Sequence, residues 1–185
     1  MIDTLGQTEV EEEKANLVVS EDFARLRDKV LSVMEIEDIP GDNLVTLSMQ
    51  HGEETIQIDF NCADDDDEDE DCDVEDDLPR VNFNVEVVRD NKMLRFGCLA
   101  GDGLTISTVS MDKNVDENNV EVNDDAYGGP YFDDLSEEIQ WGFREYLNQR
   151  HVNDDLALFI AEYSEVKLQK EYVGFLEQAA QFIDN

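Results

Sequence analysis

Hydrophobic residues along this chain follow two different periods, and the change of period divides the sequence into three parts. Between Ser20 and Pro40, and again from Asp134 to the C-terminus, apolar residues recur at spacings of three and four, as in amphipathic helices. Between Leu44 and about Val122 they alternate with polar residues, as in strands with one buried face. The pattern therefore predicts helices at both ends of the chain and a sheet between them.

The N-terminal helix has a clear start at Ser20, a favourable N-cap residue that is followed by acidic residues in the first turn. Its apolar stripe is narrow and close to a coiled-coil seam, so we expect it to pack on another helix, with the long C-terminal helix as the partner. The stripe consists of Phe23, Leu26, Val30, Val33 and Met34. Residues 1 to about 15 are polar and acidic, and we expect them to be disordered.

The central part predicts six or seven short strands joined by tight turns, which indicates an antiparallel meander. The expected strands cover about residues 44–49, 56–60, 81–87, 93–99, 104–111 and 120–122. Because one face of each strand is polar, the other face must be covered, and the terminal helices supply that cover. The expected fold class is α+β.

The last third of the chain predicts two consecutive helices. The first has a start signal at Asp134, with Glu137 at the spacing of a capping box. Its apolar face consists of Leu135, Ile139, Phe143, Tyr146 and Leu147. After an interruption at residues 150–154, Asn153 or Asp154 is a natural N-cap for a second helix of about thirty residues. The apolar positions of that helix are Leu156, Phe159, Ile160, Tyr163, Val166, Tyr172, Phe175, Leu176, Ala179, Phe182 and Ile183.

Charge changes the functional picture. The 185 residues include 48 Asp and Glu but only 13 Lys and Arg, which gives a net charge of -35. Such a field repels nucleic acids and anionic membranes and attracts Lys/Arg-rich proteins, polyamines and divalent cations. Apolar residues still make up 41% of the chain, so we expect one globular domain over residues 1–185.

Acidic residues are densest in one segment, where they occupy twelve of fourteen positions. They are Asp64, Asp65, Asp66, Asp67, Glu68, Asp69, Glu70, Asp71, Asp73, Glu75, Asp76 and Asp77. Mutual repulsion prevents such a segment from packing, so residues 61–79 predict a loop between two strands. Two interpretations stay open: a solvated loop between two strands, or a functional segment that is either a docking site for basic partners or a loose cation sink.

The sequence predicts no metal site, cofactor or catalytic residue. Residues 112–116 begin like a calcium-binding loop, but Glu117 and Asn123 stand where such a loop needs Gly and a bidentate Glu. His51 and His151 have no second ligand at metal-binding spacing. Gly97, Gly101 and Gly103 are interpreted as turn glycines, because no Gly-Lys-Ser/Thr follows them. We therefore expect a protein that is not an enzyme.

Signals of cellular location are few. Cys62, Cys72 and Cys98 are an odd count in a chain that does not need a disulfide framework, which favours a reducing compartment or an accidental pairing. No apolar run has the roughly eighteen residues of a membrane span. The N-terminus resembles neither a signal peptide nor an Arg-rich transit sequence.

Three motifs in the last third carry a family resemblance. They are Tyr127-Gly-Gly-Pro-Tyr-Phe, Glu145-Tyr-Leu before Arg150-His-Val-Asn-Asp-Asp-Leu-Ala, and Glu171-Tyr-Val-Gly-Phe-Leu. They resemble the mitochondrial glycoprotein family, which includes the complement 1q-subcomponent-binding protein and the mitochondrial acidic matrix protein. The resemblance implies a twisted sheet of about seven strands, flanked by one N-terminal and two C-terminal helices. It also implies a doughnut-shaped homotrimer in the mitochondrial matrix, in which case this chain is a mature or trimmed form.

Together these observations predict a non-enzymatic matrix protein that binds basic partners. The resemblance implies a chaperone-like or accessory factor for mitochondrial RNA-binding proteins in RNA processing, editing or translation, with no direct nucleic acid binding and no membrane insertion. The alternative is a low-affinity calcium or cation buffer. The residues expected in the core or in the assembly are Phe23, Leu26, Val30, Tyr146, Tyr163, Tyr172, Phe175 and Leu176.

Overall fold

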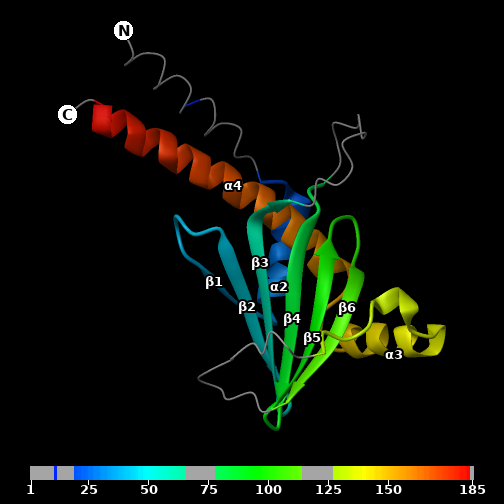
Figure 1. Cartoon of the computed structure of the whole chain (residues 1–185). Helices are drawn as coiled ribbons and strands as arrows, with labels where there is room; N and C mark the ends of the chain where they lie inside the picture. The colour runs from blue at the N-terminus through cyan, green and yellow to red at the C-terminus, as the bar shows by residue number, and fades with distance from the viewer. Residues whose placement is uncertain (1–10, 12–18, 66–77, 114–126, 184–185) are drawn as a thin grey trace.

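A six-stranded antiparallel sheet forms the centre of the computed structural model, which describes residues 11, 19–65, 78–113 and 127–183. Each strand pairs with the next along the chain, so the predicted meander is confirmed (Figure 1). The strands are β1 (Glu35–Asp38), β2 (Leu44–His51), β3 (Glu54–Asp65), β4 (Val81–Arg89), β5 (Lys92–Ala100) and β6 (Thr105–Lys113).

The strand inventory differs from the prediction of about seven strands at two places. β1 was not predicted, because its sequence Glu-Ile-Glu-Asp has a single apolar residue and forms a largely exposed edge strand. The expected strand at residues 120–122 lies outside the described residues, and so does nearly all of the segment expected to be disordered.

Helices α2 (Glu21–Leu31) and α4 (Asp154–Ile183) pack against each other over the sheet, as the narrow stripe of the N-terminal helix predicted. The Phe23 and Phe159 rings stack with centroids 6.0 Å apart. Ser20 caps α2 by accepting a hydrogen bond from the Phe23 N–H group. The core below the helices includes Val45, Leu47, Ile56, Ile58, Phe60, Val81, Phe83, Val85, Phe96, Leu156 and Ile160.

The C-terminal part of α4 extends past the edge of the sheet (Figure 1). In consequence Tyr172, Phe175, Phe182 and Ile183 are exposed, and Val173 is the buried residue beyond Lys167 in this helix. Tyr172 and Phe175 are therefore not part of the core of the chain, and Leu176 is only half-buried. Phe23 and Val30 are buried, and Leu26, Tyr146 and Tyr163 pack against the core while partly exposed.

The starts of the two C-terminal helices differ from the prediction in one case. A short 3-10 turn, η1 (Phe132–Asp134), precedes α3 (Glu137–Asn148), so Asp134 is not the cap and Ser136 occupies the N-cap position. Phe132 is fully buried and fixes this turn before the helix can begin. For α4, the Asn153 side-chain oxygen accepts a hydrogen bond from the Leu156 N–H group at 3.3 Å, as predicted.

Gly129 is required where the segment before α3 crosses β6, and Gly97 makes a close contact inside the sheet. Gly129 has a φ of +81°, and a Cβ there would lie 1.8 Å from the Val109 carbonyl oxygen. Two residues later, Tyr131 forms a β-bridge with Thr108. Gly97 lies inside β5 and is not a turn glycine as expected, because a Cβ there would lie 2.5 Å from the Thr108 hydroxyl oxygen.

An ionic cluster ties β1 to α4. The buried Lys167 ammonium group donates to Asp38, to Glu171 at 3.2 Å and to the Ile39 carbonyl oxygen at 3.3 Å. Burial opposes ionisation of Asp38, but hydrogen bonds from Lys167 and Tyr163 outweigh it and hold the pKa of Asp38 below its ordinary value. Burial likewise opposes the charge on Lys167, but its two carboxylate partners raise its pKa.

Replacing Gly129 by Ala should lower the free energy of unfolding by about 2 kcal/mol or more, because an L-residue at positive φ costs about 1–2 kcal/mol and the methyl group overlaps Val109. Gly128→Ala is the matched control, since a Cβ at Gly128 meets no atom within 4 Å. Chemical denaturation of both variants measures the difference. Equal stabilities would show that the close approach to β6 is not required.

Replacing Asp38 by Asn should lower the free energy of unfolding by about 1–2 kcal/mol at neutral pH, because the buried Lys167 loses a charged partner. The pKa of Asp38 is depressed, so its contribution is present above the unfolded value of about 3.9 and disappears as pH falls through the folded value. Denaturation from pH 3 to 8 should show the two proteins converge in acid. Glu37→Gln, on the same strand and exposed, is the control; a pH-independent gap would contradict the prediction.

Candidate functional site

The predicted acidic docking segment begins inside the sheet. Asp64 and Asp65 are the last residues of β3, and Asp65 pairs with Val81 after a register shift. The ten further acids, from Asp66 to Asp77, lie outside the described residues. The segment does connect the neighbouring strands β3 and β4, as expected.

Most positive side chains on the described part of the chain are already paired with acids. Within the described residues, at least seven Lys and Arg side chains form ion pairs. The pairs are Arg25 with Glu21 and Asp22, Arg27 with Asp28, Lys29 with Asp155, Arg89 and Arg150 with Glu54, Arg95 with Glu86 and Asp112, and Lys167 with Asp38 and Glu171. The acids that remain outnumber all bases of the chain, so the surface is strongly negative.

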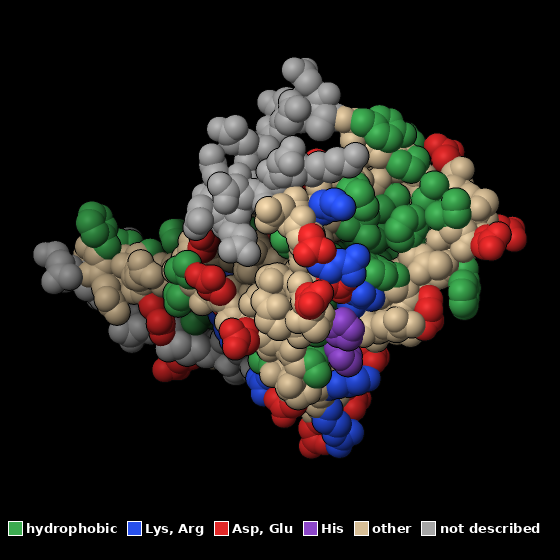
Figure 2. Space-filling view, turned by 90° about the horizontal axis from the view of Figure 1, so that it is seen from below, with side chains coloured by type: hydrophobic (Ala, Val, Ile, Leu, Met, Phe, Trp, Pro, Cys, Tyr) green, Lys and Arg blue, Asp and Glu red, His purple; other side chains and the backbone are tan. Residues whose placement is uncertain are grey.

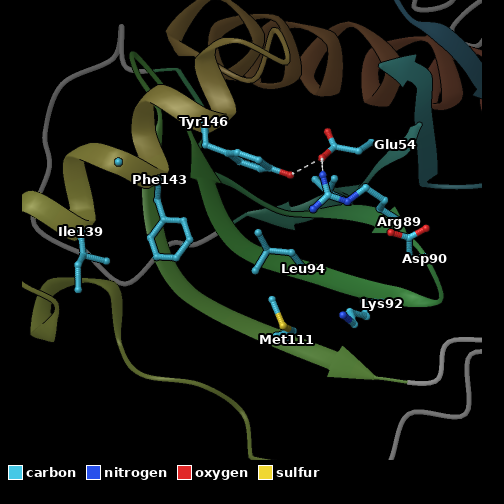
Figure 3. Close-up of a pocket in the computed structure, with 11 residues that line it drawn as sticks. Glu54, Arg89, Asp90, Lys92, Leu94, Met111, Ile139, Phe143 and Tyr146 are labelled. Atoms are coloured by element: carbon cyan, nitrogen blue, oxygen red, sulfur yellow. Dashed lines mark hydrogen bonds and ion pairs between the residues drawn. The ribbon is translucent and has the colours of Figure 1, made fainter. Parts of the chain in front are cut away.

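Glu54 is the centre of a second buried ionic cluster, which fixes α3 on the sheet (Figure 3). It is only 5% exposed at the start of β3. Its carboxylate accepts hydrogen bonds from Arg150 at 2.7 Å, Tyr146 at 3.2 Å and Arg89 at 3.3 Å. The Arg150 guanidinium also lies 3.4 Å from the centre of the Tyr146 ring and donates to the Tyr146 carbonyl oxygen. Burial raises the pKa of Tyr146, so its hydroxyl stays a donor at neutral pH.

An open groove lies beside this cluster, between α3 and the ends of β5 and β6. We call it the α3 groove; its volume is about 480 Å³. It is lined by Glu54, Val87, Arg89, Asp90, Lys92, Leu94, Met111, Ile139, Gly142, Phe143 and Tyr146. Phe143 anchors α3 through edge contacts with Phe96, at 5.6 Å between ring centroids. Leu94 and Met111 are paired across β5 and β6 and form part of the apolar wall (Figure 3).

Apolar and acidic side chains lie close together on this side of the molecule. Figure 2 shows hydrophobic side chains gathered on the side where α3 lies, with Asp and Glu at their outer edge. The exposed apolar residues of the groove are Met111 (56%) and Ile139 (48%). Acids at the start of α3, namely Asp133, Asp134, Glu137 and Glu138, are exposed.

Within the described residues, no group of three or more His, Cys, Asp or Glu side chains is arranged to hold a metal ion. His51 ends β2, and His151 occupies the turn between α3 and α4 with a φ of +61°. Cys62 and Cys98 are free thiols; burial raises the pKa of Cys62, and that of Cys98 to about 12. Among the described helices, none has the length and hydropathy of a membrane span.

Sequence reasoning missed both ionic clusters. Lys167 carried a signal, because it occupies a helix position four residues after Tyr163, where the stripe calls for an apolar side chain. No sequence signal marked Glu54, because it follows the His51-Gly52 turn beside another acid. Its ion-pair partners Arg89 and Arg150 are 35 and 96 residues away.

Comparison with known proteins agrees with this fold. The profile of the family described as mitochondrial glycoprotein matches residues 7–183. The mitochondrial acidic protein mam33 of Schizosaccharomyces pombe is 29% identical over 181 residues, which cover 80% of this chain and 67% of that protein. Neither description refers to an enzyme.

Two solved structures are similar. The p22 protein of Trypanosoma brucei matches with a TM-score of 0.74 and 25% identity, covering 98% of this chain and 96% of that chain. A hypothetical protein of Leishmania major, described as a homologue of human p32, matches with a TM-score of 0.73 over 97% and 96% of the two chains. At 16% identity the second likeness shows the fold alone.

The resemblance found in the motifs around Tyr127, Arg150 and Glu171 and the expected mitochondrial location are confirmed by these matches. The family profile covers nearly the whole chain, including the sheet, for which the sequence offered only a pattern. This chain belongs to the mitochondrial glycoprotein family.

Proposed function

We propose that this protein is a non-enzymatic, acidic protein of the mitochondrial matrix that captures Lys/Arg-rich proteins through its negative field. The proposal is based on one observation. Most Lys and Arg side chains in the described part of the chain form ion pairs with Asp or Glu of the same chain. With 48 acids against 13 bases, the acids exceed the bases by 48 - 13 = 35, and a basic protein supplies the missing counter-charge. Such a field accelerates association and discriminates against anionic partners.

The partners that fit this field include RNA-binding proteins, whose basic surfaces otherwise bind phosphates. By covering those surfaces the protein acts as a chaperone-like or accessory factor in RNA processing, editing or translation. RNA itself is repelled by a net charge of -35 and is affected only through the partner.

The whole chain is proposed to be one domain that assembles as a ring-shaped homotrimer. The exposed apolar side chains on the projecting part of α4 support assembly, because they find no cover within the described residues. The family resemblance supplies the number three.

The twelve acids from Asp64 to Asp77 should strengthen capture without being its only source. Without them the chain keeps 48 - 12 = 36 acids against 13 bases, a net charge of -23. Replacing all twelve with Asn or Gln should slow association with poly-lysine about tenfold at low salt and much less at about 1 M salt, where the screening length is about 3 Å. Stopped-flow measures the association rate at each salt concentration, and titration measures the affinity.

The matched control shuffles the order of residues 64–77 and keeps their charge, so it should bind like the original. A neutralised segment that binds as fast as the original at low salt would show that the segment is only a spacer. Affinity that is independent of salt for the original chain would overturn the proposed function itself.

Deleting residues 172–185 should abolish assembly while leaving a folded chain, because the removed apolar side chains are mostly exposed and Val173 is the buried one. Light scattering should give about 63 kDa for the original, three times 21.1 kDa, and a single-chain mass for the truncated form. A cooperative thermal melt checks that the truncated chain is folded. A mass near 21 kDa for the original would contradict the trimer.

A further inference from the structure

Gly142 in the middle of α3 keeps the α3 groove open. Glycine is among the least favourable residues in a helix interior. A Cβ at this position would meet no atom within 4 Å, so close packing does not require glycine here. Among the described residues nothing fills the space above Gly142, which lines the groove. That space suits an occupant from another molecule.

The shape and lining of the groove fit an apolar anchor. Its volume of about 480 Å³ lies within the range of roughly 300–1,000 Å³ that is usual for binding pockets. Met111 and Ile139 are about half-exposed at its sides, and Leu94 and Phe143 continue the apolar lining inward. An apolar side chain inserted here would remove all four from water.

The charges around the groove favour positive residues next to that anchor. The Glu54 carboxylate is already neutralised by Arg89 and Arg150, so it is not available to pair with a partner's Lys or Arg. Exposed acids stand at the start of α3, beside Ile139, and the chain as a whole carries -35. Lys92 and Asp90 also line the groove and carry opposite charges.

We infer that the α3 groove binds an apolar anchor of a basic, amphipathic segment in the partner protein. The inference rests on the proposed function and adds selectivity to it. The negative field attracts any basic protein, whereas the groove retains those that carry apolar and Lys/Arg residues on opposite faces of one segment. Recognition of an amphipathic helix by a hydrophobic groove follows the same physics.

Two synthetic peptides of identical Lys and Leu composition test the inference. One places Leu at helical positions i, i+3, i+4 and i+7, and the other has the same residues in scrambled order. The full chain should bind the amphipathic peptide about tenfold more tightly or better, as expected for one large buried apolar side chain. The ratio should persist when salt is raised from about 0.15 to 0.5 M, because apolar contacts are not screened.

A local readout is available in Trp141, the only tryptophan of the chain, which is exposed on α3 two residues after Ile139. Because neither peptide contains Trp, its fluorescence reports on α3 alone. The spectrum should change with the amphipathic peptide and stay nearly constant with the scrambled one.

Single substitutions test whether the preference for the amphipathic peptide comes from the α3 groove. Gly142→Leu, which fills the groove, and Ile139→Gln should bring the affinity ratio close to one while leaving binding of the scrambled peptide unchanged. Leu44→Gln is the matched control, because Leu44 is 50% exposed on β2, which is separated from β5 by two strands, and should keep the full ratio. Lys92→Gln should leave the affinity equal or higher. Thermal melts confirm that each variant is folded.

Equal affinity for the two peptides would overturn the groove inference and leave the proposed function standing, whereas failure of both to bind at low salt would overturn the proposed function. Loss of binding in Lys92→Gln would show an anion-binding groove and contradict the inference. A change of mass in Ile139→Gln by light scattering would show that a second copy of the chain covers the groove, which also contradicts it.

Discussion

The shortage of positive charge is the constraint on which the rest of this structure depends. With 13 bases for 48 acids, each base that neutralises an acid of the chain matters, and the two most buried ion pairs stand where helices must be held on the sheet. Lys167 joins α4 to β1, and Arg150 with Glu54 joins the end of α3 to β3. The long-range repulsion of the remaining acids is opposed by these contacts and by the apolar core between sheet and helices.

Elements that are marked by a local pattern of apolar residues could be predicted from the sequence, whereas contacts between distant charged residues could not. Alternation in Val81, Phe83, Val85 and Val87 is a local property, and it predicted β4 and the meander correctly. The stripe from Phe23 to Met34 likewise identified α2 and its partner α4. β1 has only Ile36 as an apolar residue to mark it. Besides its pairing with β2, it is held by the contact of Asp38 with Lys167, which is 129 residues away and cannot be predicted from a local pattern.

The start of α3 illustrates a different limit. Asp134 and Glu137 have capping-box spacing, yet the bridge of Tyr131 to Thr108 and the burial of Phe132 fix the chain before the helix begins. Tertiary contacts therefore decided between two acceptable caps. The groove beside α3 could not be predicted either, because Gly142 looks like a weak point of a helix until the space above it is seen.

A strongly charged protein can distinguish between basic partners only if it also offers contacts other than charge, and exposed apolar surface is one source of such contacts. Electrostatic attraction alone acts on every basic protein in a similar way, because the field is long-ranged and depends little on the shape of the partner. Two separate sets stand out among the exposed apolar residues, one on the projecting part of α4 and one at α3. A surface used for assembly is no longer free for partners, so under the proposed function two separate sites would let one molecule assemble and still discriminate. In that proposal the exposed apolar side chains at α3 supply the selectivity, while the many acids determine how fast partners arrive.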